Sequence, residues 1–336
     1  MRCLLLCLLL WPMVFIAPTA NAASYSGTVT VAVDLTVHQS GEPARLWLPY
    51  PVSDRDQAIT AIRLGGDFAN SGVYTDPVHG TPILYAEWLE EAASRKLTLA
   101  FNVTRREIRL DRLPELEPKW HPADYAEYLQ GTSLGPVDGE VKKLADKITK
   151  GKKTVLARAR TIYDWTVDNM YRDPATRGCG TGNVCVLLLE PGGKCTDISS
   201  VFVALCRAAG VPAREIFGLR LGKQAAEDVT AWQHCWAEFF LPGTGWVPVD
   251  PADVRKAILV EQLVMSDPKV KAYREYFWGG IDPYRVRLAV GRDLVLNPPQ
   301  AGAPLNSFGY PYAEIGGQPL DFYDPASFVY TIGYRQ

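Results

Sequence analysis

The sequence predicts an α+β protein, in which an N-terminal β-sandwich-like domain precedes a domain that combines helices with an antiparallel sheet. Residues 29–37 and 97–103 alternate apolar and polar side chains, which is the period of half-buried strands. Residues 154–170 instead carry apolar side chains at helical spacing. We therefore expect a β domain over residues 23–115 and a second domain over residues 116–336 that ends in a C-terminal β extension.

Composition supports a folded chain and excludes several classes of protein. The chain has 336 residues, of which 47% are hydrophobic and 21% are charged. This apolar share is ample for large cores, and it is not the composition of a disordered chain. The chain has 35 basic and 37 acidic residues, so the net charge is only −2. We therefore expect no nucleic-acid partner.

The first 22 residues have the pattern of a signal peptide that is cleaved on export. Arg2 supplies a positive start, residues 4–16 are mostly apolar, and Ala20-Asn21-Ala22 fits the small-x-small cleavage pattern. An uncleaved anchor is the alternative, but the apolar run is short for a span of about 20 residues. We expect a periplasmic or secreted protein without a membrane span after cleavage. Five of the seven cysteines would remain, and an odd number leaves at least one thiol unpaired.

The β domain is predicted from short apolar runs that are separated by turn residues. Residues 46–48 and 83–85 are two such runs, and Gly, Pro, Asp and Asn lie between them. Several short strands with turn signals are typical of a sandwich. The sequence does not decide whether this domain is a spacer or a substrate-binding surface.

Helical character begins near Ala123, and a stronger helix is expected from about Thr154 to Met170. Its buried face would carry Val155, Ala159, Ile162, Thr166 and Met170. Four lysines just before it form either a solvated loop or a site for an acidic partner, and the first interpretation is favoured because no aromatic residues are interleaved: Lys147, Lys150, Lys152 and Lys153.

Cys195 is predicted to lie at the N-terminus of a helix. Gly192 and Gly193 precede it, an apolar stripe at helical spacing follows, and Gly210 and Pro212 then end the helix. Unpaired N–H groups and the helix dipole favour an anion at this end, so the thiol pKa should fall below about 8.5. Alone, Cys195 would more often be a small buried side chain.

His234 and Asp250 are predicted to face each other across a hairpin. His234 opens a strand, and Asp250 closes the next one. If the loop holds three residues, Pro242 to Thr244, Asp250 lies diagonal to His234 on one face. Diagonal neighbours on paired strands are about 7–8 Å apart, which is within reach of their side chains. The carboxylate would then accept the imidazole N–H and support the charged ring. Alone, either residue has a structural interpretation, but with Cys195 they occur in the order and contexts that Cys-His-Asp acyl transfer requires.

Four motifs resemble the transglutaminase-like superfamily of papain-like thiol enzymes. They are GKCTD at 193–197, AAGVPAR at 208–214, HCWAE at 234–238 and GWVPVDP at 245–251. The resemblance is close over residues 155–255, and the β domain resembles that of bacterial exported members. It implies Cys195 as nucleophile, His234 as general base and acid, and Asp250 as the residue that orients His234. The calcium sites of animal crosslinking enzymes are not recognisable, so we expect no metal and no cofactor.

The resemblance leaves the reaction open among three possibilities. A peptidase or amidase acting on a peptide, protein or cell-wall peptide is favoured, because nothing marks a site for an acceptor amine. Protein-glutamine amine acyl transfer, which crosslinks proteins, is the first alternative. A non-catalytic binding or assembly protein that retains the fold is the second, and the oligomeric state is not indicated.

Other residues have weaker indications. Cys179 and Cys185 enclose a short loop, and a disulfide between them is as plausible as its absence in an exported protein. A zinc site at this pair is not favoured, because no histidine lies nearby in the sequence. Cys206 and Cys235 are expected to be buried. The backbone N–H of Cys195 is the expected oxyanion donor, whereas Trp165, Tyr171 and Asn183 are not assigned that role. Residues 131–135 match G-x-S-x-G, but no strand precedes Ser133, so a serine hydrolase is not expected.

Overall fold

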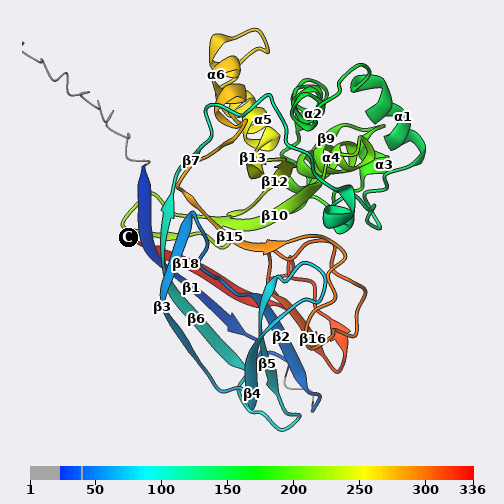
Figure 1. Cartoon of the computed structure of the whole chain (residues 1–336). Helices are drawn as coiled ribbons and strands as arrows, with labels where there is room; N and C mark the ends of the chain where they lie inside the picture. Colours follow the sequence, from blue (N-terminus) through cyan, green and yellow to red (C-terminus); the bar gives the residue numbers. More distant parts are fainter. Residues whose placement is uncertain (1–22, 39–40) are drawn as a thin grey trace, which may run out of the picture.

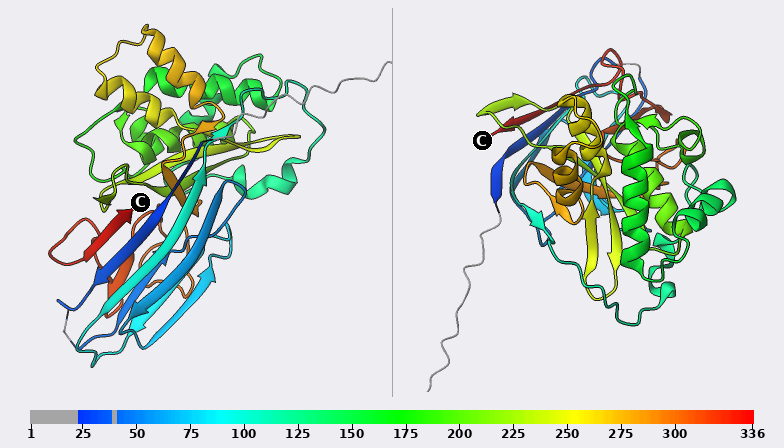
Figure 2. Two further views of the ribbon diagram at one scale, coloured as in Figure 1. Left: turned by 90° about the vertical axis from the view of Figure 1, so that its left-hand side faces the viewer. Right: turned by 90° about the horizontal axis from the view of Figure 1, so that it is seen from above.

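The computed structural model describes residues 23–38 and 41–336, so the predicted signal peptide at 1–22 lies outside the described residues. Helices gather at one end of the molecule and two layers of strands at the other (Figure 1; Figure 2, left). No helix in the described part of the chain is long and apolar enough to cross a membrane.

Two antiparallel five-stranded sheets form the strand-rich end. The first has the order β11-β18-β1-β6-β3: Ala226–Asp228, Val329–Arg335, Ser24–Asp34, Lys96–Arg106 and Gln57–Gly66. The second has the order β17-β16-β2-β5-β4: Gln318–Pro319, Tyr312–Ile315, Ala44–Pro49, Pro82–Trp88 and Asn70–Thr75. Val29 and Leu99 of the first sheet share one buried cluster with Leu46 and Leu84 of the second, so the sheets pack face to face.

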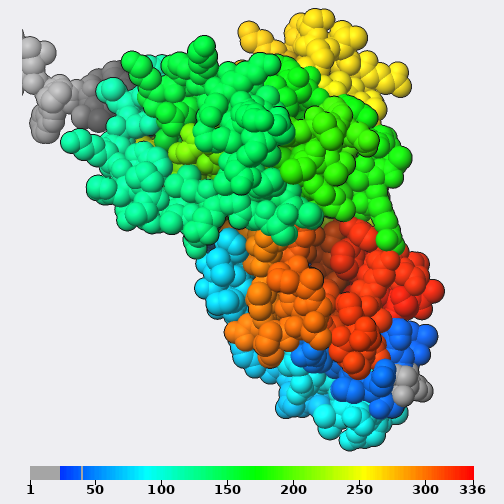
Figure 3. All heavy atoms as spheres, turned by 90° about the vertical axis from the view of Figure 1, so that its right-hand side faces the viewer, coloured from blue at the N-terminus to red at the C-terminus, as the bar shows by residue number. Residues whose placement is uncertain are grey.

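The strands of the predicted C-terminal β extension lie within these two sheets. β18 pairs with β1, and β16 pairs with β2. Accordingly, segments from the two ends of the sequence lie side by side in the lower part of Figure 3. The expected alternation is present at Val29 and Val33, which are buried, but β1 ends at Asp34 and Val37 is 63% exposed. The first strand therefore begins earlier, at Ser24, and ends earlier than the pattern at 29–37 indicated.

A third antiparallel sheet, of four strands, links the sandwich to the helices. Its order is β13-β12-β10-β15: Gly245–Val249, Gln233–Leu241, Ala213–Arg220 and Arg285–Val290. Two short pairs accompany it, β14 with β7 and β8 with β9: Gly280–Ile281, Ile108–Arg109, Tyr171–Arg172 and Gly192–Gly193. The helical segments are η1, α1, α2, α3, α4, α5 and α6: Pro122–Tyr128, Gly139–Ile148, Val155–Asn169, Val184–Leu187, Cys195–Ala208, Pro251–Val260 and Pro268–Tyr276.

Helix α4 is the centre of the helical end. It packs against β10 and β12 on one side and against α1 and α2 on the other, and every one of its residues is buried. Gly210, with φ of 76°, ends it as the sequence indicated. Helix α2 also matches its prediction, because Thr154 caps it and Ala159 and Ile162 are buried. The helical turn near Ala123 is the 3₁₀ segment η1, and the first α-helix starts later, at Gly139.

Candidate functional site

Helix α4 begins at Cys195, and the Asp197 side chain fixes the backbone that precedes it by accepting hydrogen bonds. The Asp197 carboxylate accepts the backbone N–H of Lys194 at 2.9 Å and that of Gly182 at 2.8 Å. The loop containing Gly180 lies against the same carboxylate: Gly180 has φ of 91°, and a Cβ there would lie 1.8 Å from Asp197 Oδ2. Only glycine fits there without displacing the loop. Cys195 is thereby held at the first position of the helix, 3% exposed.

The hairpin of β12 and β13 brings His234 and Asp250 together. Leu241 pairs with Gly245, so the connecting loop is the three residues that the sequence analysis assumed. Asp250 follows the last paired residue of β13 and caps helix α5. Its Oδ2 lies 2.7 Å from Nε2 of His234. Because a carboxylate only accepts, Nε2 carries the proton and Nδ1 is left for another partner.

A buried arginine that sequence reasoning missed holds this pair in place. Arg285, on β15, is fully buried and donates to Asp250 at 2.6 Å and to Asp253 at 2.9 Å. It also pairs with Asp282, and Arg220 pairs with Asp253. The spacing of Asp253, three residues after Asp250 at a helix start, is a local signal for a carboxylate there. No pattern in the neighbouring sequence indicates a role for Arg285, because this residue reaches the site only through the pairing of β15 with β10.

The surroundings shift the pKa of His234 upward. Burial and the positive charge of Arg220 lower its pKa, but the negative charges of Asp253 and Asp250 raise it by more. For Asp253, burial raises the pKa, and Arg220 and His234 lower it far more, so this carboxylate stays ionised. The site therefore favours a positively charged imidazole.

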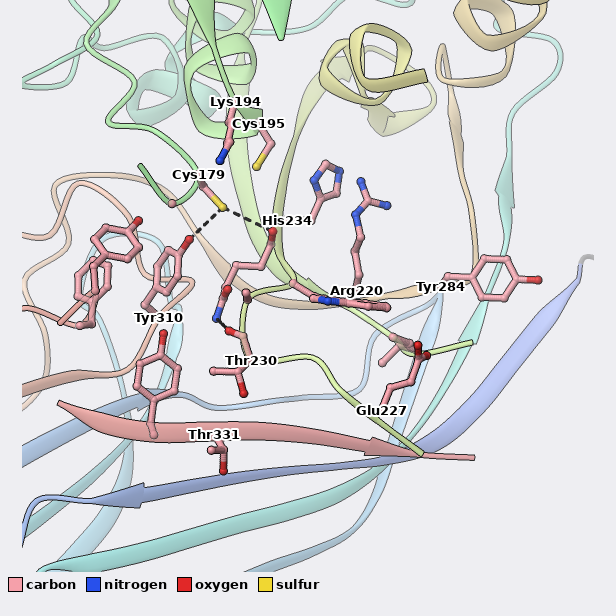
Figure 4. Close-up of a pocket in the computed structure, with 18 of the residues that line it drawn as sticks. Cys179, Lys194, Cys195, Arg220, Glu227, Thr230, His234, Tyr284, Tyr310 and Thr331 are labelled. Atoms are coloured by element: carbon pink, nitrogen blue, oxygen red, sulfur yellow. Dashed lines mark hydrogen bonds between the residues drawn. The ribbon is translucent and has the colours of Figure 1, made fainter. Parts of the chain in front are cut away.

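Three thiols meet at the start of α4. The sulfur atoms of Cys179, Cys195 and Cys235 all lie within 4.8 Å of one another, and the three residues are buried. Hydrogen bonds from Cys179 and Cys235 lower the pKa of Cys195 well below its ordinary value, and His234 adds to this, whereas burial opposes it. Figure 4 shows the Cys195 sulfur beside the His234 ring.

The other cysteines differ partly from expectation. The possible disulfide between Cys179 and Cys185 is absent: both thiols are free, Cys179 is buried and Cys185 is exposed. Cys179 lies in the thiol cluster with Cys195, while Cys185 lies in α3 with its side chain exposed. Cys206 is buried as predicted. Cys235 is buried too, in the thiol cluster.

Cys195 and His234 open onto a pocket of about 1120 Å³. Its floor comes from the sandwich, where β18 supplies Thr331, and its roof comes from the start of α4 (Figure 4). Aromatic side chains form one wall: Tyr310, Phe322, Tyr323 and Tyr330. Basic side chains outnumber acidic ones in the lining: Arg172, Lys194, Arg220, Lys223 and Lys256 against Glu227 and Asp282.

The remaining predicted residues lie elsewhere or have structural roles. Ser133 donates its hydroxyl to Asp293 at 2.6 Å, which fits a loop contact and not a hydrolase elbow. Tyr171 is 48% exposed, and Asn183 accepts from Val186 as the cap of α3. Trp165 packs against the core of the helical end. The four lysines that precede α2 are exposed: Lys147, Lys150, Lys152 and Lys153. Only the last three lie in the expected loop, because Lys147 belongs to the last turn of α1.

The reactivity of Cys195 gives a first prediction. Its alkylation by iodoacetamide should remain fast well below pH 8.5, the usual range of a thiol, because the thiolate persists as its pKa is lowered. His234→Ala should shift the rate profile to higher pH. The measurement follows the alkylation rate against pH in a Cys185→Ser background, which removes the exposed thiol. If the alkylation rate of Cys195 in the Cys185→Ser protein rose only near pH 8.5, the prediction of a lowered pKa would be contradicted.

The sequence of this chain is similar to that of a known family and of two bacterial proteins. The sequence profile of the transglutaminase-like superfamily matches residues 142–251. An uncharacterized protein of Haemophilus influenzae is 38% identical over 343 residues, covering 93% of this chain and 92% of that protein. The uncharacterized protein YebA of Bacillus subtilis is 25% identical over 201 residues, covering 55% of this chain and 24% of YebA.

Among solved structures, a candidate cysteine protease from Cytophaga hutchinsonii has a similar fold. The TM-score is 0.54 at 16% identity, and the alignment covers 94% of this chain and 99% of that one. Because the likeness extends over nearly both whole chains, it includes the strand-rich end as well as the helical end.

Proposed function

This chain belongs to the transglutaminase-like superfamily, and on that premise we propose that it is an exported thiol hydrolase of peptide or side-chain amides. The observation that carries the proposal is the contact of 2.7 Å between His234 and Asp250, in a pocket that Cys195 also lines. A thiolate, an imidazolium and an orienting carboxylate are the groups that acyl transfer through a thioester requires.

The first half-reaction forms a thioester on Cys195. The thiolate attacks the amide carbonyl carbon, and the carbonyl electrons move to oxygen. In the described residues the backbone N–H of Cys195 has no acceptor, so it is free to donate to that oxyanion. The C–N bond then breaks as His234 gives its proton to the leaving nitrogen. Asp250 keeps the imidazole oriented throughout.

The second half-reaction returns the thiolate. Neutral His234 takes a proton from water, the hydroxide attacks the thioester, and the C–S bond breaks to leave a carboxylic acid. The charge network around Asp250 supports this cycle, because a rigid carboxylate stabilises the imidazolium each time it forms.

Export and substrate class complete the proposal. The positive start, apolar run and small-x-small site at residues 1–22 support cleavage on export, and exported substrates include proteins, peptides and cell-wall peptides. The aromatic wall and the excess of basic side chains in the pocket support peptides with apolar and acidic groups.

The test is a product analysis with peptide and cell-wall fragments as substrates, with and without an added primary amine. We expect one product with a new carboxylate and one with a released amine or ammonia, and little transfer to the added amine. Dominant transfer to the amine would replace the hydrolase with an acyltransferase. No covalent chemistry with any fragment, together with an alkylation profile of an ordinary thiol, would contradict the enzyme proposal itself.

A further inference from the structure

The acyl-transfer proposal uses one thiol, yet the site holds three. Cys179 comes from the loop before α3, Cys195 from the start of α4, and Cys235 from β12. Cys179 precedes Cys195 by 16 residues and Cys235 follows it by 40, and the three sulfur atoms lie within 4.8 Å of one another. Cys179 and Cys235 support the Cys195 thiolate as hydrogen-bond donors, but that role does not require the donor to be a thiol.

The spacing suits one ion bound by three sulfur ligands. In tetrahedral zinc sites the Zn–S distance is about 2.3 Å, which places neighbouring sulfurs about 3.8 Å apart. Sulfurs that already lie within 4.8 Å reach this spacing through small side-chain shifts. A ligand set made only of sulfur selects thiophilic cations and disfavours Mg²⁺ and Ca²⁺.

Hydroxyl groups contact two of the three sulfurs, and the Cys179 thiol also donates to the backbone carbonyl of Gln233 at 3.5 Å. The hydroxyl of Tyr310 donates to Cys179 Sγ at 3.1 Å, and the hydroxyl of Thr196 lies 3.2 Å from Cys235 Sγ. Hydroxyl donors of this kind orient ligands and spread their negative charge in metal sites. Cys179 and Cys195 line the pocket, which gives an ion a route from solvent and leaves a fourth position for water.

We propose that Cys179, Cys195 and Cys235 form a binding site for a thiophilic d¹⁰ cation such as Zn²⁺, which blocks the nucleophile while it is bound. The cation takes the Cys195 thiolate and displaces one proton from each of the other two thiols. The resulting complex of a 2+ ion and three thiolates carries a charge of −1, and the imidazolium of His234 lies beside it. The sulfur lone pair of Cys195 is then committed to the metal and cannot attack an amide or an alkylating reagent.

Cobalt(II) is the probe for the site, because its spectrum reports sulfur ligands directly. The full mature chain is reduced, its five thiols are counted, and Co²⁺ is added. We expect sulfur-to-cobalt charge-transfer absorption and strong visible bands of tetrahedral cobalt, both removed by Zn²⁺. Zinc should also stop alkylation of Cys195, and EDTA should restore it.

Matched variants separate the cluster from the other thiols. Cys179→Ser and Cys235→Ser should each weaken Zn²⁺ binding by about 100-fold, measured by competition with a chromophoric chelator. Cys185→Ser, which removes the exposed thiol, should leave it unchanged. Circular dichroism and thermal unfolding establish that each variant is folded.

Two results would overturn the inference: no charge-transfer band at millimolar Co²⁺ in the fully reduced protein, or a band that persists in both Cys179→Ser and Cys235→Ser. The spectroscopic test does not depend on amide hydrolysis; only the blocking of turnover rests on the proposed function. Zinc binding without hydrolysis would refute the hydrolase alone, and hydrolysis without zinc binding would refute this site alone.

Discussion

Cys195→Ala is expected to lower kcat/KM for a cleaved amide by about 10⁴-fold or more. Alanine keeps the start of α4 and the backbone N–H, but it has no sulfur to form the thioester. Because Asp197 holds the helix start through backbone donors, the fold should not depend on the thiol. Steady-state kinetics on a substrate from the fragment screen measure the effect.

Cys185→Ala is the matched control, because this thiol is exposed and lies outside the site. It should retain the turnover of the unaltered protein, and both variants should unfold at similar temperatures. Turnover that survives Cys195→Ala at more than a tenth of its original rate would rule out Cys195 as the nucleophile.

Arg285→Met is expected to lower the free energy of unfolding by about 3–5 kcal/mol. Arg285 is fully buried and contacts three carboxylates, those of Asp250, Asp253 and Asp282. Removing the guanidinium leaves buried negative charges without their main partner, which costs much more than losing one hydrogen bond. Urea unfolding, followed by circular dichroism, measures the change.

The control for this prediction is Arg287→Met, two residues along the same strand. The side chain of Arg287 is 29% exposed and lies 3.7 Å from Asp54, so its loss should change stability by less than about 1 kcal/mol. Equal losses from the two substitutions would contradict the role assigned to the buried network.

The loss of folding stability at low pH is an independent test of the ion pairs that Arg285 makes. Arg285 helps to lower the pKa of Asp253 and Asp282, although burial alone would raise both. A carboxyl whose pKa is lower in the folded state adds stability above its unfolded pKa of about 3.9, and this is lost as pH falls through the folded value. The unaltered protein should therefore lose stability below about pH 4, and Arg285→Met should lose less over the same range.

Local patterns in the sequence predicted the parts of the site that depend on neighbouring residues. Two glycines before Cys195 and an apolar stripe after it were enough to place the thiol at a helix start, where α4 begins. A loop of three residues was enough to place His234 beside Asp250, because hairpin register follows from loop length. Both predictions concern residues whose geometry is set within one short segment.

Local sequence patterns did not predict which strands pair when they are far apart in the sequence. Arg285 reaches Asp250 because β15 pairs with β10, and β18 completes a sheet with β1, at the other end of the chain. The spacing of Cys179 and Cys185 suggested a loop disulfide, but spacing does not fix the direction of the side chains. Cys179 instead lies in the thiol cluster with Cys195, and no periodicity in the sequence indicates this contact.

The proposed reaction depends on a covalent bond between the substrate's acyl group and Cys195. The most direct measurement is mass spectrometry of the protein after rapid acid quenching during turnover, followed by peptide mapping. We expect a mass increase equal to the acyl part of the substrate, located on the peptide that contains Cys195 and removed by hydroxylamine. Turnover with no adduct on Cys195, or with the adduct on another residue such as Ser133, would contradict it.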